Sequence, residues 1–501
     1  MKMGALLVAA IACAGQASAQ DRPLHDAYDA RWARHLVPML VEVVRFPTYA
    51  GNERAFIDQK AWLARTARDL GFAFRDAGKV VEIELAAAPG SPVLGLAVHG
   101  DVVLAEGQWT FPAFEAAVKD GMVQGRGVAD DKGPLVQALL AMKVLQESGR
   151  QRTHTLRLMV GSDEESGSTD MKEYLESNAP PDLTLVLDSA FPVGVGEKAW
   201  NLLTLETSLA VRDPAAEVRL ASLEAGLAAS IVPDLAVAKI EAVPGHEGEL
   251  AALSLRIAAR ALPPGTGLEV AGEGAALVLR VRGKAAHAGV NARGGRNALV
   301  ALATVLEPEL PPGGGRDILA FARLAGQDLE GTALGLKAAH PTFGRAVAVP
   351  TMVRATPEGG LKLSINIRTN PGETGSVLEQ RLAERVRDFN ARTGASLKPG
   401  GFFNSEPLVH DPEARIVKRL LAAYRRATGR NEPASVSAGG TYAKKIPRSI
   451  VYGMWFPGKP YPGHDVDEKV AIAELHLGAH ALIEALADLT CSEPIKDAFK
   501  P

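Results

Sequence analysis

The sequence predicts an α/β protein, in which a mostly parallel sheet is flanked by helices and a second, α+β domain is inserted as a lid. Three observations support this fold class. The chain has 501 residues, more than one hydrophobic core usually supports. From about residue 31 to 195, helical patterns alternate with short apolar runs, as they do in α/β sheets. Beyond residue 197, alternating strand patterns and Gly/Pro-rich turns predominate, which indicates a second domain.

The composition is that of a soluble globular protein. Apolar residues make up 47% of the chain and charged residues 23%, which argues against disorder and against a coiled coil. A formal net charge of -3 gives no electrostatic reason to expect nucleic acid as a partner. No later stretch is apolar enough, for long enough, to cross a bilayer. We therefore expect a small polar substrate, with no nucleic acid and no membrane insertion.

Residues 1–19 have the layout of a secretory signal peptide. Lys2 precedes a short apolar run, and an A-x-A sequence ends at Ala19. Export to the periplasm or the medium is expected. Cys13 faintly resembles a lipoprotein cleavage site, but the leucine expected three residues earlier is missing, so lipidation is the weaker alternative. After cleavage only Cys491 remains, which excludes an intramolecular disulfide and thiolate metal ligation.

The first domain is expected to begin at residue 20 and to run to residue 197. Its apolar runs read as buried strands, and each of them ends at a polar motif. That placement is informative because ligands of open α/β sheets collect outside the carboxyl ends of the strands. In chain order, the patterns predict helices over 33–46 and 57–72, a strand over 93–101, a helix over 132–149, and strands over 154–163 and 183–189.

Residues 198–398 are predicted to form the inserted domain, with strand patterns over 201–212, 274–286 and 361–370. The first domain is expected to resume over 399–490. There, 411–429 reads as a strongly amphipathic helix, and 449–456 as a strand leading to a histidine. Residues 491–501 are expected to be a loose tail.

Five metal-type side chains lie in strand-to-loop contexts. Each has an ordinary reading when taken alone, such as a polar turn, a helix cap or a surface histidine. Taken together, two imidazoles and three carboxylates suit a pair of divalent ions, with one carboxylate bridging. This combination predicts a two-metal hydrolase. The five candidates are His99, Asp130, Glu165, Asp188 and His464.

Two further carboxylates stand beside these candidates. Asp101 follows His99 by two residues and would bond the second ring nitrogen, fixing the tautomer. Glu164 directly precedes Glu165. Adjacent residues at a strand end point in different directions, so one can ligate a metal while the other reaches the metal-bound water as general base.

The motifs HGDVV, GVADDKGP, GSDEESGSTDMKEYL, DSAFPVGVGEKA, GKAAHAGVNARGGRNA, SINIRTNPGE, GGTYA and PGHD occur in this order. The chain thereby resembles the co-catalytic dizinc peptidases of family M20, and most of all its PepV-type dipeptidases. The resemblance covers nearly all of the chain after the signal peptide. It implies His99 and Asp188 on one zinc, Glu165 and His464 on the other, and Asp130 bridging both. Manganese or cobalt would also suit these ligands.

The same resemblance implies further roles. Glu164 would move the proton from the bridging water to the leaving amine. His287 would stabilise the oxyanion from across the cleft, and Arg368 would clamp the substrate's terminal carboxylate. The peptide bond between Asp130 and Asp131 would be cis. Backbone donors to the same substrate carboxylate are expected at Gly439, Gly440 and Thr441.

One position departs from the PepV pattern. Ser230 in ASIVPD stands where those relatives carry asparagine, and a shorter hydroxyl donor cannot span the same distance. This leaves the preferred substrate length open. The long insertion would let one chain complete its own site, so a monomer is expected rather than a homodimer.

The function predicted from the sequence is therefore that of an exported two-zinc dipeptidase acting on short peptides. Two alternatives stay open. An N-acyl-amino-acid deacylase or a carboxypeptidase would use the same metals on a different acyl group. A non-catalytic peptide-binding protein is the alternative from another class, although binding alone would not need Glu164.

Overall fold

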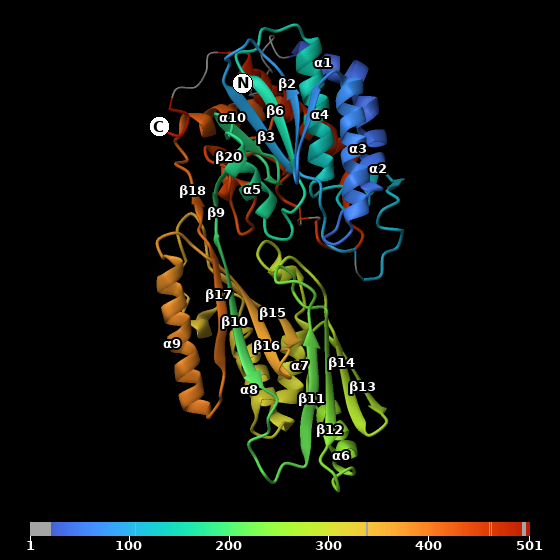
Figure 1. Cartoon of the computed structure of the whole chain (residues 1–501), viewed down its shortest axis with the longest axis vertical. Helices are drawn as coiled ribbons and strands as arrows, with labels where there is room; N and C mark the ends of the chain where they lie inside the picture. Colours follow the sequence, from blue (N-terminus) through green and yellow to red (C-terminus); the bar gives the residue numbers. More distant parts are fainter. Residues whose placement is uncertain (1–21, 106, 337–338, 460, 462, 493–496) are drawn as a thin grey trace, which may run out of the picture.

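The computed structural model describes residues 22–105, 107–336, 339–459, 461, 463–492 and 497–501. The chain forms two bodies stacked along the long axis of the molecule (Figure 1). The first body holds the early part and the end of the chain, and the second body holds the middle. The predicted signal peptide lies outside the described residues. Among the described residues, every helix is too short or too polar to cross a membrane.

The first body is organised around one mixed sheet, in the order β1-β2-β6-β3-β7-β20-β9-β18, with β19 paired to β9. The central strands β6, β3, β7 and β20 are parallel, which confirms the predicted fold class. Strands β1 and β2 at one edge and β9 and β18 at the other pair antiparallel. The bounds are β1 (Ala73–Ala77), β2 (Val80–Leu85), β3 (Val93–His99), β6 (Thr155–Gly161), β7 (Leu183–Val186), β9 (Gly194–Glu197), β18 (Leu408–Val409), β19 (Ser435–Ser437) and β20 (Ser449–Val451).

Helices cover both faces of this sheet, so its central strands are apolar on both sides. In β3, Leu96 and Val98 join the large core beneath the main helices, whereas Ala97 joins a smaller cluster on the opposite face. The main helices are α1 (Arg22–Ala27), α2 (Ala33–Val44), α3 (Glu53–Leu70), α4 (Lys132–Glu147), α10 (Arg415–Thr428) and α11 (Ile472–Thr490). The opposite face carries α5 (Thr169–Ser177) and the short helix η5 (Tyr442–Lys444).

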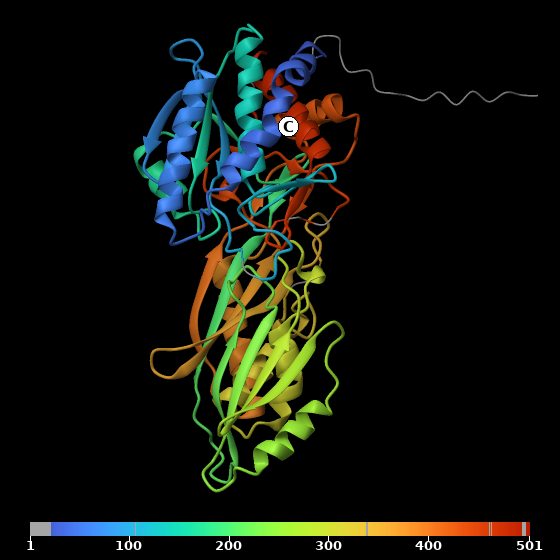
Figure 2. The ribbon, with the colours of Figure 1, turned by 90° about the vertical axis from the view of Figure 1, so that its right-hand side faces the viewer.

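The second body is an antiparallel sheet backed by helices and has its own core. Its strand order is β13-β14-β12-β11-β15-β16-β10-β17. Figure 2 shows its long strands running along the length of the molecule. The bounds are β10 (Ala199–Ser208), β11 (Val218–Ala225), β12 (Leu235–Ala242), β13 (Gly267–Glu273), β14 (Ala276–Arg282), β15 (Val347–Ala355), β16 (Gly360–Thr369), β17 (Lys398–Ser405), α6 (Glu249–Ala258), α7 (Ala298–Leu306), α8 (Gly314–Ala325) and α9 (Gly375–Thr393).

Several short elements complete the fold. They lie mostly in connections, and two of the small strand pairs flank the metal-type residues. They are the sheet of β4 (Ala117–Lys119), β5 (Met122–Gln124) and β22 (Lys469–Ala471), the pair β8 (Ser189–Ala190) and β21 (Met454–Trp455), and the helical turns η1 (Tyr28–Trp32), η2 (Ala292–Gly294), η3 (Glu307–Glu309) and η4 (Thr332–Leu334).

The chain passes between the two sheets twice. On the way out, β9 ends at Glu197 in the first sheet and β10 begins at Ala199 in the second. On the way back, β17 still pairs with β10, and the first sheet is reached only at Leu408. The predicted boundary between residues 398 and 399 is therefore too early. Pro399 and the two glycines after it, which are rare inside strands, hid β17 in the sequence.

Two other predictions about local structure are corrected. The expected strand over 449–456 is split into β20 and β21, because Gly453 adopts a left-handed φ of 80°. A Cβ there would lie 2.6 Å from Phe191, so only glycine fits. The tail is not loose where it is described. The Ile416 N–H donates to the Ala498 carbonyl at 2.9 Å, and Phe499 stacks on His410.

Candidate metal centre and substrate cavity

The five predicted metal-type residues converge at the carboxyl edge of the parallel strands. His99 is the last residue of β3, Asp188 follows β7, and Glu165 follows β6. Asp130 precedes α4, and His464 lies in the loop before β22. Parallel strands end at the same edge of a sheet, which brings residues from distant parts of the chain together there.

These residues form two groups that share Asp130, and in each group the ligand atoms lie within 4.8 Å of one another. In the first group, His99 Nε2 lies 2.9 Å from Asp130 Oδ1 and 3.9 Å from Asp188 Oδ2. In the second, His464 Nε2 lies 3.3 Å from Asp130 Oδ2 and 2.9 Å from Glu165 Oε1. The two oxygens of Asp130 therefore face different groups, as a bridging carboxylate requires. The peptide bond after Asp130 is cis, as the family resemblance implied.

The electrostatics of the site fit a divalent cation. Burial raises the pKa of Asp188 well above its usual range, and the nearby Asp130 and Asp131 carboxylates raise it further. Burial alone would lower the pKa of His464, but Glu165 and Asp130 outweigh it and raise this pKa to about 10. The site thus concentrates buried negative charge that needs a positive partner. Imidazole and carboxylate donors suit zinc and also accept manganese or cobalt.

Asp101 lies beside the second ring nitrogen of His99, as predicted, and has a further role. His99 Nδ1 makes its hydrogen bond to the Asp101 carbonyl oxygen at 3.0 Å, whereas the carboxylate is 3.5 Å away. The carboxylate instead accepts the backbone N–H groups of Glu164 and Glu165, at 3.2 and 3.0 Å. A backbone carbonyl fixes the histidine tautomer as well as a carboxylate would. Asp101 is therefore a positioning residue for the turn that carries both glutamates.

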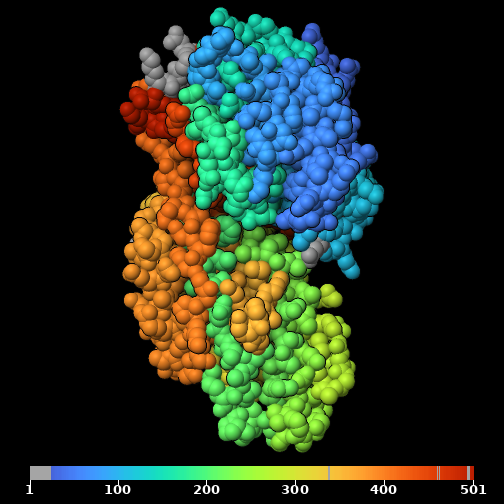
Figure 3. All heavy atoms as spheres, viewed as in Figure 1, coloured from blue at the N-terminus to red at the C-terminus, as the bar shows by residue number. Residues whose placement is uncertain are grey.

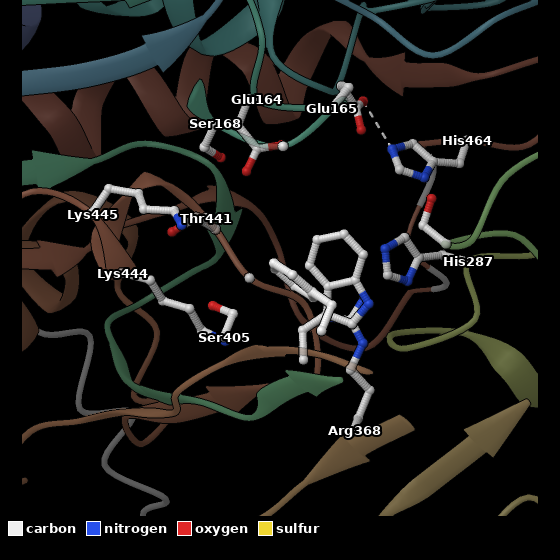
Figure 4. A pocket seen from close by; sticks show the side chains of 15 residues that line it. Glu164, Glu165, Ser168, His287, Arg368, Ser405, Thr441, Lys444, Lys445 and His464 are labelled. Carbon is white, nitrogen blue, oxygen red and sulfur yellow. Dashed lines mark hydrogen bonds and ion pairs between the residues drawn. The ribbon is translucent and has the colours of Figure 1, made fainter. Parts of the chain in front are cut away.

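Glu164 lies beside the metal-type residues, and its side chain faces the substrate cavity (Figure 4). Burial raises the pKa of its carboxyl well above the usual range; His99 opposes this, and the Glu165, Asp101 and Asp130 carboxylates add to it. A buried carboxyl with a raised pKa can accept a proton and release it again near neutral pH.

His287 reaches the same cavity from the second body, and its ring centroid lies 5.1 Å from that of His464. Its Nδ1 accepts the backbone N–H groups of Gly289 and Val290, at 3.0 and 2.9 Å. Burial lowers the pKa of His287 well below its usual range, with His464 and Arg368 contributing. The ring is therefore neutral with its proton on Nε2, which makes it a hydrogen-bond donor toward the cavity.

Arg368 lies on β16 at another wall of the cavity and is 3% exposed. Its Nε donates to Asn366 Oδ1 at 3.1 Å, and its guanidinium lies 5.1 Å from the Trp200 ring centroid. Within the described residues, Arg368 Nη1 and Trp200 Nε1 are buried donors with no hydrogen-bond partner. Buried donors are normally paired, so these two point to a ligand with acceptor oxygens.

The predicted backbone donors are largely used inside the protein. The Gly439 N–H donates to Ser437 Oγ at 2.9 Å. The Thr441 N–H and hydroxyl both donate to the buried Glu197 carboxylate, at 3.2 and 2.7 Å. The expectation that Gly439 and Thr441 hold the substrate with their backbone N–H groups is therefore wrong. Gly440 lines the cavity, as does Ser230.

Two residues near the metal groups were not singled out from the sequence. Glu468 is 2% exposed; it accepts the N–H groups of Gly127 and Ala129, both at 2.9 Å, and that of Asp130 at 3.3 Å. It also forms an ion pair with Arg126 at 2.9 Å. Its carboxylate thereby ties the His464 loop to the loop before α4. In the sequence it is the last acid of HDVDE, which resembles an ordinary run of solvent-exposed acidic residues.

The second missed residue is Tyr461, whose hydroxyl donates to Asp130 Oδ2. Its ring packs against Trp455, with ring centroids 4.8 Å apart. Tyrosine is not a usual ligand of divalent ions, so no metal-ligand pattern would have found it.

The cavity has an empty volume of about 650 Å³ and lies where the two bodies meet, at the waist seen in Figure 3. In Figure 4 Glu164, Glu165 and His464 lie along the upper part of the cavity, Lys444 and Lys445 lie at the left, and Arg368 lies below His287. The cavity can therefore bind a molecule whose anionic end lies some distance from the metal groups.

Comparison with known proteins agrees with this geometry. The chain is 27% identical over 408 residues to the Beta-Ala-Xaa dipeptidase of Lactobacillus delbrueckii subsp. lactis, which covers 81% of this chain and 84% of that protein. Human carnosine dipeptidase 1 shares the fold, with a TM-score of 0.60 at 14% identity over 94% of this chain and 99% of that one. The di-peptidase Dug1p of Saccharomyces cerevisiae does so with a TM-score of 0.57 at 13% identity, over 93% and 98%. Residues 95–488 match the model of Peptidase family M20/M25/M40, and the chain is a peptidase of this family.

Proposed function

We propose that this peptidase is a two-metal dipeptidase that hydrolyses short peptides with a free C-terminal carboxylate. The observation that carries the proposal is the unpartnered, buried Arg368 Nη1 in the cavity that Glu165 and His464 of one metal-type group also line. A guanidinium at that place suits a carboxylate at a limited distance from the scissile bond. The sequence relative named a Beta-Ala-Xaa dipeptidase supports this substrate class.

Different residues of the chain have different roles in the reaction. Two bound divalent ions, zinc by preference, would polarise the carbonyl and lower the pKa of the attacking water. Glu164 accepts the proton of that water and passes it to the amine that leaves. His287 donates its Nε2–H to the oxygen on which negative charge develops. Arg368 holds the terminal carboxylate, so that the bond to be cut lies beside Glu164.

We also propose that the enzyme is exported and works as a monomer. The signal-like sequence of residues 1–19 supports export. His287 of the second body and His464 of the first line the same cavity within a single chain, which supports a site complete in one subunit.

The test is a panel of free dipeptides, tripeptides and N-acetyl amino acids, offered to the purified mature chain before chelation, after chelation and after return of zinc. Hydrolysis of dipeptides that stops with chelator and returns with zinc is the expected result. Hydrolysis of the acetylated compounds alone would replace the proposal with a deacylase. Binding of peptides without turnover, in a protein that holds its metals, would make it a binding protein.

A further inference from the structure

The wall of the cavity away from the metal groups carries more positive charge than one substrate carboxylate needs. Arg368, Lys444 and Lys445 all line the cavity; in Figure 4 the two lysines lie at the left, across from Glu165 and His464, and Arg368 lies below His287. Arg368 alone is sufficient for a terminal carboxylate, because a guanidinium can bind both of its oxygens. Two lysines therefore remain for another anionic group.

Three carboxylates face these cations. Glu164 and Glu197 face Arg368, and Glu197 and Glu406 face Lys444, but of the three only Glu164 lines the cavity. Glu197 is 1% exposed and lies behind Thr441, whose hydroxyl and N–H it accepts, so it does not line the cavity. The Lys444 ammonium donates to the Lys198 carbonyl oxygen, which is neutral. Lys445 is exposed and makes no ion pair with any described residue.

Apolar surface and neutral donors accompany these cations. Trp200 and Phe403 line the same cavity and meet edge to face, with ring centroids 5.1 Å apart. The Trp200 Nε1–H has no partner among the described residues, and Ser405 adds a hydroxyl group to the wall. Such a wall can pack against the methylene groups of a side chain while it binds a carboxylate at the end.

We propose that the enzyme prefers peptides whose C-terminal residue is acidic. Arg368 binds the main-chain carboxylate, while Lys445, with Lys444 and Ser405, binds the aspartate or glutamate side chain. This inference rests on the proposed dipeptidase function and names its substrate class. Because Lys445 is exposed to water, its ion pair with the substrate side chain raises kcat/KM by a modest factor and is not an absolute requirement for hydrolysis.

The test compares substrates that differ only in charge. We expect kcat/KM for Ala-Asp to exceed that for Ala-Asn about fivefold, and likewise for Ala-Glu over Ala-Gln. Added salt should reduce both ratios, because exposed charges are screened. In Lys445→Gln the Ala-Asp to Ala-Asn ratio should fall close to one, and in Lys445→Glu it should fall below one.

Arg448→Gln is the matched control, because it removes a positive charge three residues further along the chain. The Arg448 side chain contacts the Pro181 carbonyl and Asp182 and does not line the cavity, so the ratio should keep its wild-type value. Equal rates on Ala-Asp and Ala-Asn overturn the inference while the dipeptidase function stands. A preference for Ala-Ala-Ala over Ala-Ala, without a preference for Ala-Asp over Ala-Asn, would also overturn the inference. Hydrolysis of no dipeptide overturns both.

Discussion

The two ends of the cavity are built in opposite ways. At the metal end, the acids and histidines are held by hydrogen bonds from the protein itself, such as those from the Glu164 and Glu165 N–H groups to Asp101. At the other end, Arg368 Nη1 and Trp200 Nε1 have no partner among the described residues, and Lys445 is exposed. Within the part of the chain that the structure describes, the metal end still has two unpartnered buried atoms, His464 Nδ1 and Asp131 Oδ1, but its ligand atoms face one another across the metal-type groups. The other end leaves its donors free for the substrate.

This difference assigns the reaction itself to the metal end and the choice of substrate to the other end. Rigid support is needed where a proton must move over a fixed distance, because small misplacements lower the rate strongly. Free donors are needed where affinity comes from bonds made only when the substrate arrives. Substitutions at the metal end should therefore change turnover or metal binding, while those at the other end should change the choice of substrate.

The largest effect is expected from Glu164→Gln. Loss of the proton acceptor should lower kcat about 10³-fold, while the metal content measured by atomic absorption stays at the wild-type level. The adjacent Glu165→Gln is the contrasting variant, because it removes a member of a metal-type group and should lower the metal content itself. Full turnover in Glu164→Gln would refute the assigned role.

The next largest effect is expected from His287→Ala. Removal of one oxyanion donor should lower kcat about 10²-fold, with KM little changed and metal content intact. His246→Ala, an exposed histidine of the same body, is the control and should keep wild-type kinetics. A rise in KM with normal kcat would show that His287 binds substrate and does not stabilise the transition state.

Glu468→Gln should have a smaller effect. It should lower the affinity for metal without affecting proton transfer by Glu164. The amide keeps one acceptor oxygen, so the N–H groups of Gly127 and Ala129 cannot both keep their acceptor, and the ion pair with Arg126 is lost. We expect metal affinity to fall about tenfold or more, as for other partners of metal ligands. A competition titration with a fluorescent chelator measures this. Glu474→Gln, which removes a surface pair with Lys459, is the control. Unchanged affinity would show that Glu468 only stabilises the fold.

The metal end could be predicted from the sequence because each of its residues stands in a recognisable local motif. His99, Glu165 and Asp188 each stand at or just after a buried apolar run, and parallel strands bring such ends together. The parallel centre of the first sheet followed from the same runs. Asp101 was assigned to the correct site, beside His99 Nδ1, but its hydrogen bonds to the Glu164 and Glu165 N–H groups are not visible in the sequence.

The substrate end was predicted less completely because most of its residues stand in no recognisable motif. Trp200 lies on β10, Phe403 on β17 and Lys445 after η5, and none of these positions stands out in the sequence. The Pro-Gly-Gly sequence that opens β17 also hid the strand and moved the predicted boundary. Whether the Thr441 N–H is free depends on the buried Glu197, and burial of a single carboxylate is not visible in a sequence.

The smallest expected effect is a pH dependence of substrate choice. Burial lowers the pKa of Lys444 to about 8; Arg368 and Lys445 add to this, and Glu197 and Glu406 oppose it. Lys444 is therefore charged below about pH 8 and becomes neutral above it, so its attraction for an acidic side chain is present at low pH and lost as pH rises. The ratio of kcat/KM for Ala-Asp to that for Ala-Asn should fall about twofold between pH 7 and 9. Titrations at the metal end are common to both substrates and cancel in this ratio. In Lys444→Arg, whose charge persists throughout, the ratio should stay flat, whereas a wild-type ratio that rises with pH would contradict the assignment of Lys444 to the selective end of the cavity.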